Sequence, residues 1–186
     1  MILRHLIRAV PLLTAILFAA CARPPQFNVL LVTLDTTRAD RLGCYGYTAA
    51  HTPVLDSLAA DGVLFESAFT PAPVTLPAHA SLLTGLVPPV HGVRDNGIYR
   101  LRDEAVTLAE LLGDAGMATS ATIAAYVLTS RFGLAQGFAH YDERLKGVTG
   151  KPAAFYVERS AGEVTDAAIQ WLKQRNSNNP HSPYRD

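Results

Sequence analysis

A hydroxyl and an imidazole lie four positions apart in the stretch PVTLPAHASLLTG, residues 73–85. They belong to Thr75 and His79, and Pro77 between them is typical of the first turn of a helix. A hydroxyl at this place lies at the positive end of the helix dipole, where backbone N–H groups can hold a phosphoryl or sulfuryl group during its transfer. Thr75 is therefore a candidate nucleophile. The alternative is that Thr75 only caps the helix and that His79 faces outward or is satisfied within it.

A carboxylate ends the apolar, β-branched run NVLLVTLD, residues 28–35. Such a run is typical of a buried parallel strand, and the ligands of open α/β sheets bind outside the carboxyl ends of the strands. Carboxylate oxygens suit a divalent cation, and a cation held by Asp35 would lower the pKa of the Thr75 hydroxyl. The alternative is that Asp35 only starts a turn or caps a helix.

A third polar cluster, HGVRDNG at residues 91–97, lies between segments that we expect to be helical. Its density of Gly, Asn, Asp and Arg makes it a candidate part of the same site. The alternative is a solvated turn, because Asp-Asn-Gly is favourable turn chemistry.

The elements that must position these residues are indicated by caps and by periodicity. Thr52 and Pro53 are typical of a helix start and Gly62 of its end, and Thr107 is a candidate cap for a second helix. The expected helices are 52–62, 76–85, 106–116 and 162–176, and the expected strands are 28–35, 63–70 and 117–126. Their alternation predicts an α/β fold, a sandwich around a mostly parallel sheet.

The first 22 residues have the order of a secretory signal peptide, with two arginines, an apolar run and small residues at a cleavage site. In one interpretation residues 1–20 are a lipoprotein signal and Cys21 becomes lipidated. In a second, cleavage follows Ala22, and in a third the segment stays as an anchor. Residues 23–27 then form a linker. We expect an exported protein, periplasmic or at the cell surface, that is tethered to a membrane.

The composition excludes a nucleic-acid partner. There are 16 basic and 16 acidic side chains, so the formal net charge is zero, and the basic residues form no run or stripe. If Cys21 is lipidated, Cys44 is left without a second cysteine and no internal disulfide can form. We expect Cys44 to be a small buried residue.

The stretches NVLLVTLDTTRADRLGCYGY, residues 28–47, and TPVLDSLAADGVLFESAFTPAPVTLPAHASLLTGLVPPVHGVRDNG, residues 52–97, resemble the N-terminal part of the sulfatase family in the alkaline phosphatase superfamily. RFGLAQGFAHYDE, residues 131–143, is similar to a stretch that many sulfatase-like proteins carry downstream. The resemblance implies an α/β/α sandwich over residues 28–186. It also implies hydrolysis of sulfate or phosphate esters at a divalent metal, calcium in many sulfatases and zinc or manganese in phosphatase-like relatives.

The resemblance implies roles for individual residues. The first metal aspartate of the family falls on Asp35, and the second falls on Thr36, which is a neutral and weaker ligand. The nucleophile, which is also a metal ligand, falls on Thr75. The family's C/S-x-P-x-R motif reads T-L-P-A-H here, with His79 in place of arginine. Formylglycine is an aldehyde made from a CH₂–S or CH₂–O group, whereas oxidation of threonine would give a ketone, so no formylglycine is expected.

T-x-P-x-H also looks like the nucleophile motif of nucleotide pyrophosphatases/phosphodiesterases, which form a phospho-enzyme on an unmodified threonine. In that resemblance His79 belongs to the catalytic motif, and Asn96 orients the non-bridging oxygens of the substrate. His181, in P-H-S-P-Y, is similar to a substrate-contacting histidine of the family.

The sequence contains no Asp-His dipeptide, whereas family members carry an Asp-His metal pair far downstream. We therefore interpret the chain as the N-terminal part of a metal-dependent hydrolase, C-terminally incomplete. Its substrate would be a small-molecule, glycan-linked or lipid-linked sulfate or phosphate ester. Two alternatives remain open: a truncated, non-catalytic exported domain, and a phosphodiesterase or phosphoglycerol-type transferase that uses Thr75.

Overall fold

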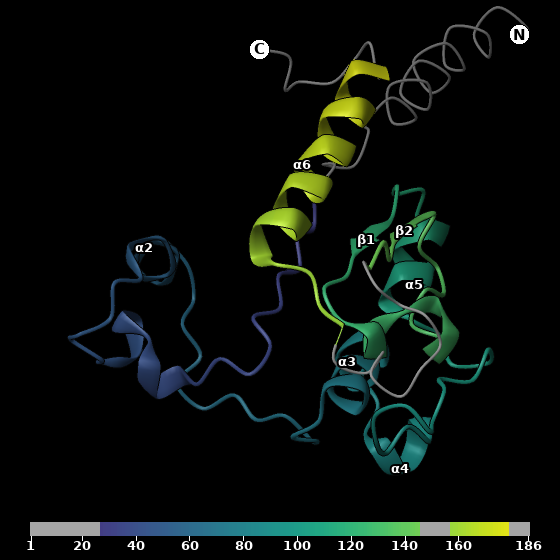
Figure 1. Cartoon of the computed structure of the whole chain (residues 1–186), viewed down its shortest axis with the longest axis horizontal. Coiled ribbons are helices and arrows are strands. Elements are labelled where there is room, and N and C mark those ends of the chain that lie inside the picture. The colour runs from purple at the N-terminus through teal and green to yellow at the C-terminus, as the bar shows by residue number, and fades with distance from the viewer. Residues whose placement is uncertain (1–26, 146–156, 179–186) are drawn as a thin grey trace, which may run out of the picture. The chain divides into compact units, whose positions relative to one another are not determined.

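The computed structural model describes residues 27–145 and 157–178, and the chain divides into two units, Met1–Arg41 and Leu42–Asp186 (Figure 1). The first unit contains the 3-10 helix η1 (Ala39–Arg41). The second contains η2 (Gly43–Tyr45), α2 (Pro53–Asp61), α3 (Thr75–Thr84), α4 (Pro88–His91), α5 (Leu108–Asp114), β1 (Ser120–Thr122), η3 (Tyr126–Leu128), η4 (Ser130–Phe132), β2 (His140–Asp142) and α6 (Ala161–Asn178). Helices and a parallel sheet together confirm the expected α/β class.

The strand predicted at residues 28–35 is not formed. Its apolar side chains are exposed, and Leu30 is 83% accessible. After it the backbone turns, and the N–H of Thr37 donates to the carbonyl of Leu34 over 3.3 Å. A strand needs a neighbour for its backbone groups, and no strand pairs with this segment in the described part of the first unit. The prediction is wrong here because composition indicates what suits a buried strand but not whether a partner lies beside it.

The second predicted strand, residues 63–70, is also absent from the second unit as described. Phe69 in this segment is 91% exposed. The segment is attached to η2 by a hydrogen bond in which the hydroxyl of Tyr45 donates to the carbonyl of Phe65 over 2.9 Å. The alternation of apolar and polar residues is real, but a turn interrupts the segment at residues 66–67 and no strand pairs with it among the described residues.

Helix α2 begins and ends where the sequence predicts, after Thr52 and before Gly62. The Thr52 hydroxyl does not cap the helix but donates to the carboxylate of Asp56 over 3.2 Å and accepts from the N–H of Gly43 over 3.0 Å. The N–H of Cys44 donates to the same carboxylate over 2.7 Å. These bonds attach η2 to the first turns of α2. Cys44 itself is half-buried.

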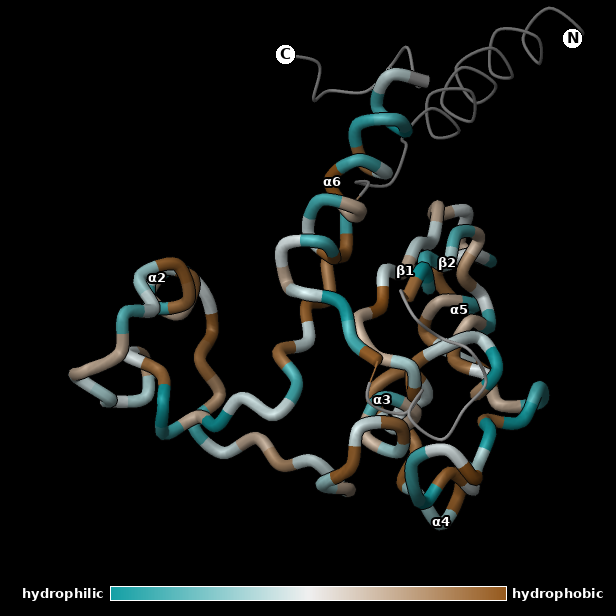
Figure 2. Tube along the Cα trace, viewed as in Figure 1, coloured by the Kyte–Doolittle hydropathy of each residue, from teal (hydrophilic) through white to brown (hydrophobic). Residues whose placement is uncertain are grey.

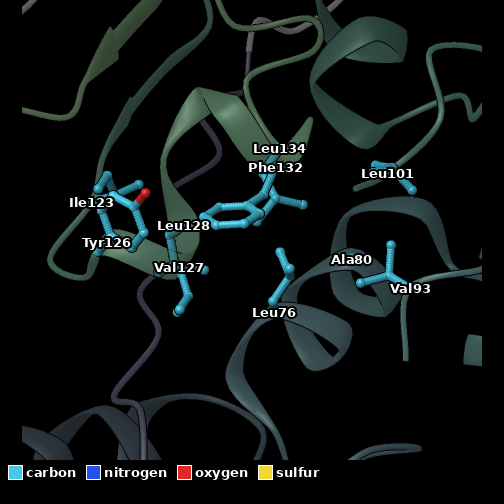
Figure 3. Close-up of a cluster of buried hydrophobic side chains, with 10 residues drawn as sticks. All are labelled: Leu76, Ala80, Val93, Leu101, Ile123, Tyr126, Val127, Leu128, Phe132 and Leu134. Atoms are coloured by element: carbon cyan, nitrogen blue, oxygen red, sulfur yellow. The ribbon is translucent and has the colours of Figure 1, made fainter. Parts of the chain in front are cut away.

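A hydrophobic cluster in the second unit packs α3 against η3, η4 and the segments that flank them (Figure 3). Figure 3 shows the Leu76 side chain directed from α3 toward Phe132. The buried members of the cluster are Leu76, Ala80, Val93, Leu101, Ile123, Tyr126, Val127, Leu128, Phe132 and Leu134. Burial of Leu76 and Ala80, one helical turn apart, makes one face of α3 part of the core.

Helix α5 confirms the predicted cap at Thr107. The N–H of Glu110 donates to the Thr107 hydroxyl over 3.2 Å, and the N–H of Thr107 donates to the Glu110 carboxylate over 2.7 Å, which completes a capping box. The Thr107 hydroxyl also donates to the carbonyl of Gln136 over 3.0 Å. The start of α5 is thereby attached to the loop before β2.

Strands β1 and β2 run parallel, with Ala121 opposite Tyr141. The strand predicted at 117–126 is confirmed in shorter form, whereas β2 was not expected. Asp142, at the end of β2, is buried and accepts a hydrogen bond from the guanidinium of Arg159 over 3.1 Å. Arg159 also donates to the carbonyl of Glu163 in α6 over 3.1 Å. This buried ion pair links the sheet to the first turn of α6.

Hydrophilic and hydrophobic residues both occur along α6, as Figure 2 shows. Nowhere in residues 27–145 and 157–178 is there a helix long and apolar enough to cross a bilayer. The predicted signal segment 1–22, with Cys21, and the predicted substrate-binding His181 lie outside the described residues.

Candidate active site at the start of helix α3

Thr75 is the first residue of α3, and Val74 before it is the N-cap, with extended backbone at φ −133° and ψ 137°. The Thr75 hydroxyl is not used as a cap and makes no hydrogen bond within the described part of the chain. Thr75 is half-buried. The interpretation that Thr75 only caps the helix is therefore not supported, because its hydroxyl is available for another partner.

The cap of α3 comes instead from Asn96, whose side-chain oxygen accepts a hydrogen bond from the N–H of Leu76 over 2.9 Å. Pro77 has no N–H, and the N–H of Ala78 donates to the carbonyl of Val74 over 3.0 Å. Of the orphan donors at this helix start, the N–H groups of Val74 and Thr75 have no acceptor among the described residues. The expected cradle of several backbone N–H groups is thus reduced to two donors.

The hydrogen bond to Leu76 also sets the orientation of the Asn96 amide. Because Oδ1 is the acceptor, the NH₂ group is the part of the side chain that can donate to a ligand. No hydrogen bond of this NH₂ group occurs within the ranges that the structure describes. The N–H of Asn96 donates to the carboxylate of Asp95 over 2.7 Å, which shapes the turn that carries it. Asn96 therefore places one amide donor beside the start of α3.

The His79 ring leans back toward the start of α3, as helical side chains do. Its Nδ1 lies 2.8 Å from the carbonyl oxygen of Thr75. A carbonyl only accepts, so Nδ1 carries the proton and, in the neutral ring, Nε2 is the basic nitrogen. The His79 side chain is therefore hydrogen-bonded to the backbone carbonyl of Thr75, the candidate nucleophile, and does not face outward.

His91, to which the sequence assigned no role, is fully buried at the end of α4. Its Nδ1 accepts from the N–H of Val93 over 3.1 Å, and its Nε2 lies 2.9 Å from the hydroxyl of Ser81 in α3. Because a backbone N–H can only donate, Nδ1 is unprotonated and Nε2–H donates to Ser81. Burial lowers the pKa of His91 and so favours this neutral ring.

Asp35 and Thr36 belong to the first unit, where they form the centre of the turn after residues 28–34. The N–H of Thr36 donates to the Asp35 carboxylate over 2.8 Å. Thr36 has a φ of 57°, in the left-handed region that β-branched residues rarely adopt. The alternative reading of Asp35 as a turn aspartate therefore describes its local structure, and its role as a metal ligand stays a prediction.

A divalent cation needs several oxygen, nitrogen or sulfur ligands in one place. No group of three His, Cys, Asp or Glu residues comes together among residues 27–145 and 157–178. The described residues therefore do not complete a metal site, and we derive no chemical step through a metal.

Comparison with models of protein families gives a match over most of the chain. The model of the sulfatase family matches residues 27–184. The chain belongs to the sulfatase family. Sulfatases hydrolyse sulfate esters, and the family depends on metals in general.

Several sulfatases are similar to this chain in sequence. It is 38% identical to arylsulfatase A of Homo sapiens over 105 residues, which are 54% of the chain and 20% of that protein. It is 28% identical to N-acetylglucosamine-6-O-sulfatase of Bacteroides thetaiotaomicron over 184 residues, which are 90% of the chain and 32% of that protein. The solved structure of a 2-O GAG sulfatase aligns with a TM-score of 0.49 and 29% identity, over 61% of this chain and 24% of that one. The chain thus spans about a fifth to a third of the length of these relatives.

Proposed function

We propose that the protein is a hydrolase of sulfate or phosphate esters in which Thr75 is the nucleophile. Membership of the sulfatase family supports ester hydrolysis. The observation that carries the assignment is the hydrogen bond from Leu76 to Asn96, which brings an amide donor to the start of α3, the turn that also carries the unused hydroxyl of Thr75.

In the proposed reaction the Thr75 oxygen forms a bond to phosphorus or sulfur while the bond to the leaving oxygen breaks. The hydroxyl proton is lost and the leaving oxygen gains a proton, and water then cleaves the covalent intermediate. The amide donor of Asn96 and the backbone N–H of Thr75 would stabilise the negative charge on the non-bridging oxygens. His79, bonded to the Thr75 carbonyl, would hold the first turn in place and line the site.

From the family motif in the sequence we propose Asp35 as a cation ligand, with Thr36 and Thr75 as neutral oxygen donors. This assignment rests on the motif and not on the positions of these residues in the structure. Calcium, zinc and manganese all accept such ligands. When bound, the cation would stabilise charge on the substrate and lower the pKa of the nucleophile. The remaining ligands would come from residues beyond those that the structure describes.

A phosphodiester or phosphomonoester is the second candidate substrate, and the threonine favours it. The branched Cβ of Thr75 cannot give the formylglycine aldehyde, so the hydroxyl itself would attack, as the T-L-P-A-H motif indicates. A phosphoglycerol-type transferase would use the same covalent step with an alcohol in place of water. A non-catalytic exported domain would retain the Asn96 cap but turn over no ester.

We further propose that the protein is exported and tethered to a membrane by a lipid on Cys21, with residues 1–20 removed. Its substrate would then be an ester on a small molecule, a glycan or a lipid outside the cytoplasm. The name of the relative from Bacteroides thetaiotaomicron, N-acetylglucosamine-6-O-sulfatase, makes a glycan sulfate one class to assay.

The first experiment is to read the coding sequence past the codon of Asp186 and to express the complete reading frame. The product is assayed with p-nitrophenyl sulfate, p-nitrophenyl phosphate and bis-(p-nitrophenyl) phosphate, with added calcium, zinc or manganese. Thr75→Ala should abolish turnover of whichever ester is cleaved, and Thr75→Ser, which keeps a hydroxyl, should retain part of it. Full activity in the alanine variant would rule out Thr75 as the nucleophile, and no turnover of any ester would favour the non-catalytic domain.

A further inference from the structure

We propose that His91 is a positioning residue that holds Asn96 against the start of α3. This inference rests on the proposed roles of Thr75 and Asn96, and it adds a residue that would act without touching the substrate. His91 ends α4 and is 0% exposed, so a ligand in solution cannot reach it.

The two ring nitrogens of His91 hold two different parts of the chain. Nε2–H donates to the Ser81 hydroxyl in α3 over 2.9 Å, and Nδ1 accepts from the N–H of Val93 over 3.1 Å. Burial disfavours the charged ring, and a protonated Nδ1 could not accept from Val93. The ring is thus a neutral bridge between a helix and the segment that follows α4.

The segment 91–96 is attached to α3 at both ends. At its start His91 bonds to Ser81, and at its end Asn96 bonds to the N–H of Leu76 over 2.9 Å. Between them the Val93 side chain is fully buried in the hydrophobic cluster. The N–H of Val93 donates to the His91 ring, and Val93 lies only three positions before Asn96 in the chain. The ring can therefore fix the backbone that carries the Asn96 side chain.

Loss of the bond to Val93 would leave a buried N–H without an acceptor, and the segment would have to move to satisfy it. The Asn96 side chain would then lose its hydrogen bond to the N–H of Leu76, and its NH₂ group would lose its orientation. His91 therefore acts through Asn96 on the site at Thr75.

Two substitutions separate the two bonds of the ring. In His91→Asn the side-chain oxygen can occupy the place of Nδ1 and accept from Val93. In His91→Gln the amide reaches toward Ser81 and leaves the N–H of Val93 without an acceptor. Hydrogen exchange at the Leu76 amide, measured at single-residue resolution in the complete protein, reports the Asn96 bond without any assay of activity. The N–H of Leu111 in α5, which donates to the carbonyl of the N-cap residue Thr107, is the internal control.

His91→Gln should raise the exchange rate of Leu76 about tenfold relative to Leu111, the scale of one lost hydrogen bond, and His91→Asn should raise it less than about threefold. An unchanged rate in His91→Gln would overturn the proposal. If His91→Gln does not fold, His91→Leu takes its place, since leucine is apolar like the buried site and leaves the N–H of Val93 without an acceptor: a similar rise at Leu76 supports the proposal and no rise overturns it. Ser81→Ala, which keeps the bond to Val93, should behave as His91→Asn does.

A double-mutant cycle on kcat distinguishes positioning from general stabilisation. If His91 acts through Asn96, His91→Gln should lower kcat about tenfold in the native background and leave it within about twofold in the Asn96→Ala background. Equal losses in both backgrounds would overturn the proposal. If the exchange rates change as expected but the native protein cleaves no ester, positioning by His91 stands and the proposed hydrolase function fails.

Discussion

The side-chain oxygen of Asn96 lies 2.9 Å from the backbone nitrogen of Leu76, and this hydrogen bond joins two segments 20 residues apart. It supplies a helix cap from a distant turn in place of a local one. The NH₂ group of the same side chain stays at the start of α3, the turn that carries the hydroxyl of Thr75, so this amide has a structural role and a proposed chemical role.

The two roles of Asn96 can be separated by substitution. Asn96→Asp keeps an acceptor for the Leu76 N–H, so unfolding in urea should change by less than about 0.5 kcal/mol, but it removes the donor and adds negative charge. We expect kcat to fall by about 10²-fold or more on the ester that the native protein cleaves. Asn96→Ala should lower kcat by a similar factor, with a measurable remainder, and should also cost about 1 kcal/mol of stability. An aspartate variant with native turnover would exclude Asn96 as a donor to the substrate.

The peptide that contains Thr75 should have its unmodified mass when the protein is isolated, because a secondary alcohol cannot be converted to the formylglycine aldehyde. After rapid acid quenching during turnover, the same peptide should gain the mass of one phosphoryl or one sulfuryl group. Mass spectrometry thus tests the nucleophile and identifies the transferred group. Finding the label on another residue would contradict the assignment, and the Thr75→Ala protein is the control.

The buried pair Asp142–Arg159 should make the stability of the second unit depend on pH. Hydrogen bonds from Arg144 and the nearby charge of Arg159 hold the pKa of Asp142 well below its usual range. A carboxyl whose pKa is lowered on folding stabilises the protein above its unfolded pKa of about 4, and this stability is lost as the pH falls through the lower folded value. Stability in urea should therefore decline below about pH 4.

Asp142→Asn should flatten that decline and lower the free energy of unfolding at pH 7 by roughly 3 kcal/mol, because the buried guanidinium of Arg159 loses its counter-charge. The exposed pair Arg100–Asp103 is the matched control, and Asp103→Asn should cost less than about 0.5 kcal/mol. Equal effects of the two substitutions would show that the Asp142 pair is not effectively buried.

Gly137 should not tolerate a side chain. It has a φ of 79°, and a Cβ there would lie 2.6 Å from the carbonyl carbon of Ala109 and closer still to the backbone nitrogen of Glu110. Gly137→Ala should therefore cost roughly 3 kcal/mol or more. Gly116, with a φ of 83° and nothing within 4 Å of a Cβ, is the control, and its substitution should cost about 1 kcal/mol. Thermal unfolding of both variants measures the difference, and equal costs would contradict the close approach.

Local signals in the sequence predicted the helices well. Thr52, Pro53 and Gly62 bound α2 as expected, and Thr107 forms the capping box of α5 with Glu110. The cap at Thr107 is read correctly because both partners of the interaction lie within a few positions, whereas Thr52 marks the start of α2 without capping it. The strands at 28–35 and 63–70 were predicted wrongly, since a strand depends on a neighbour that its own sequence does not specify.

By itself the sequence determined the order of the helices, the family and the positions of the candidate nucleophile and metal aspartate, because these depend on residue type and short spacing. Only the tertiary structure decided that Asn96 caps α3, that His91 bridges Ser81 and Val93, and that Asp142 pairs with Arg159. Each of these polar contacts except the bond to Val93 joins side chains or backbone groups far apart in the chain. Their partners are selected by what the core buries together, since a buried polar group must find an acceptor or donor wherever the packing brings one.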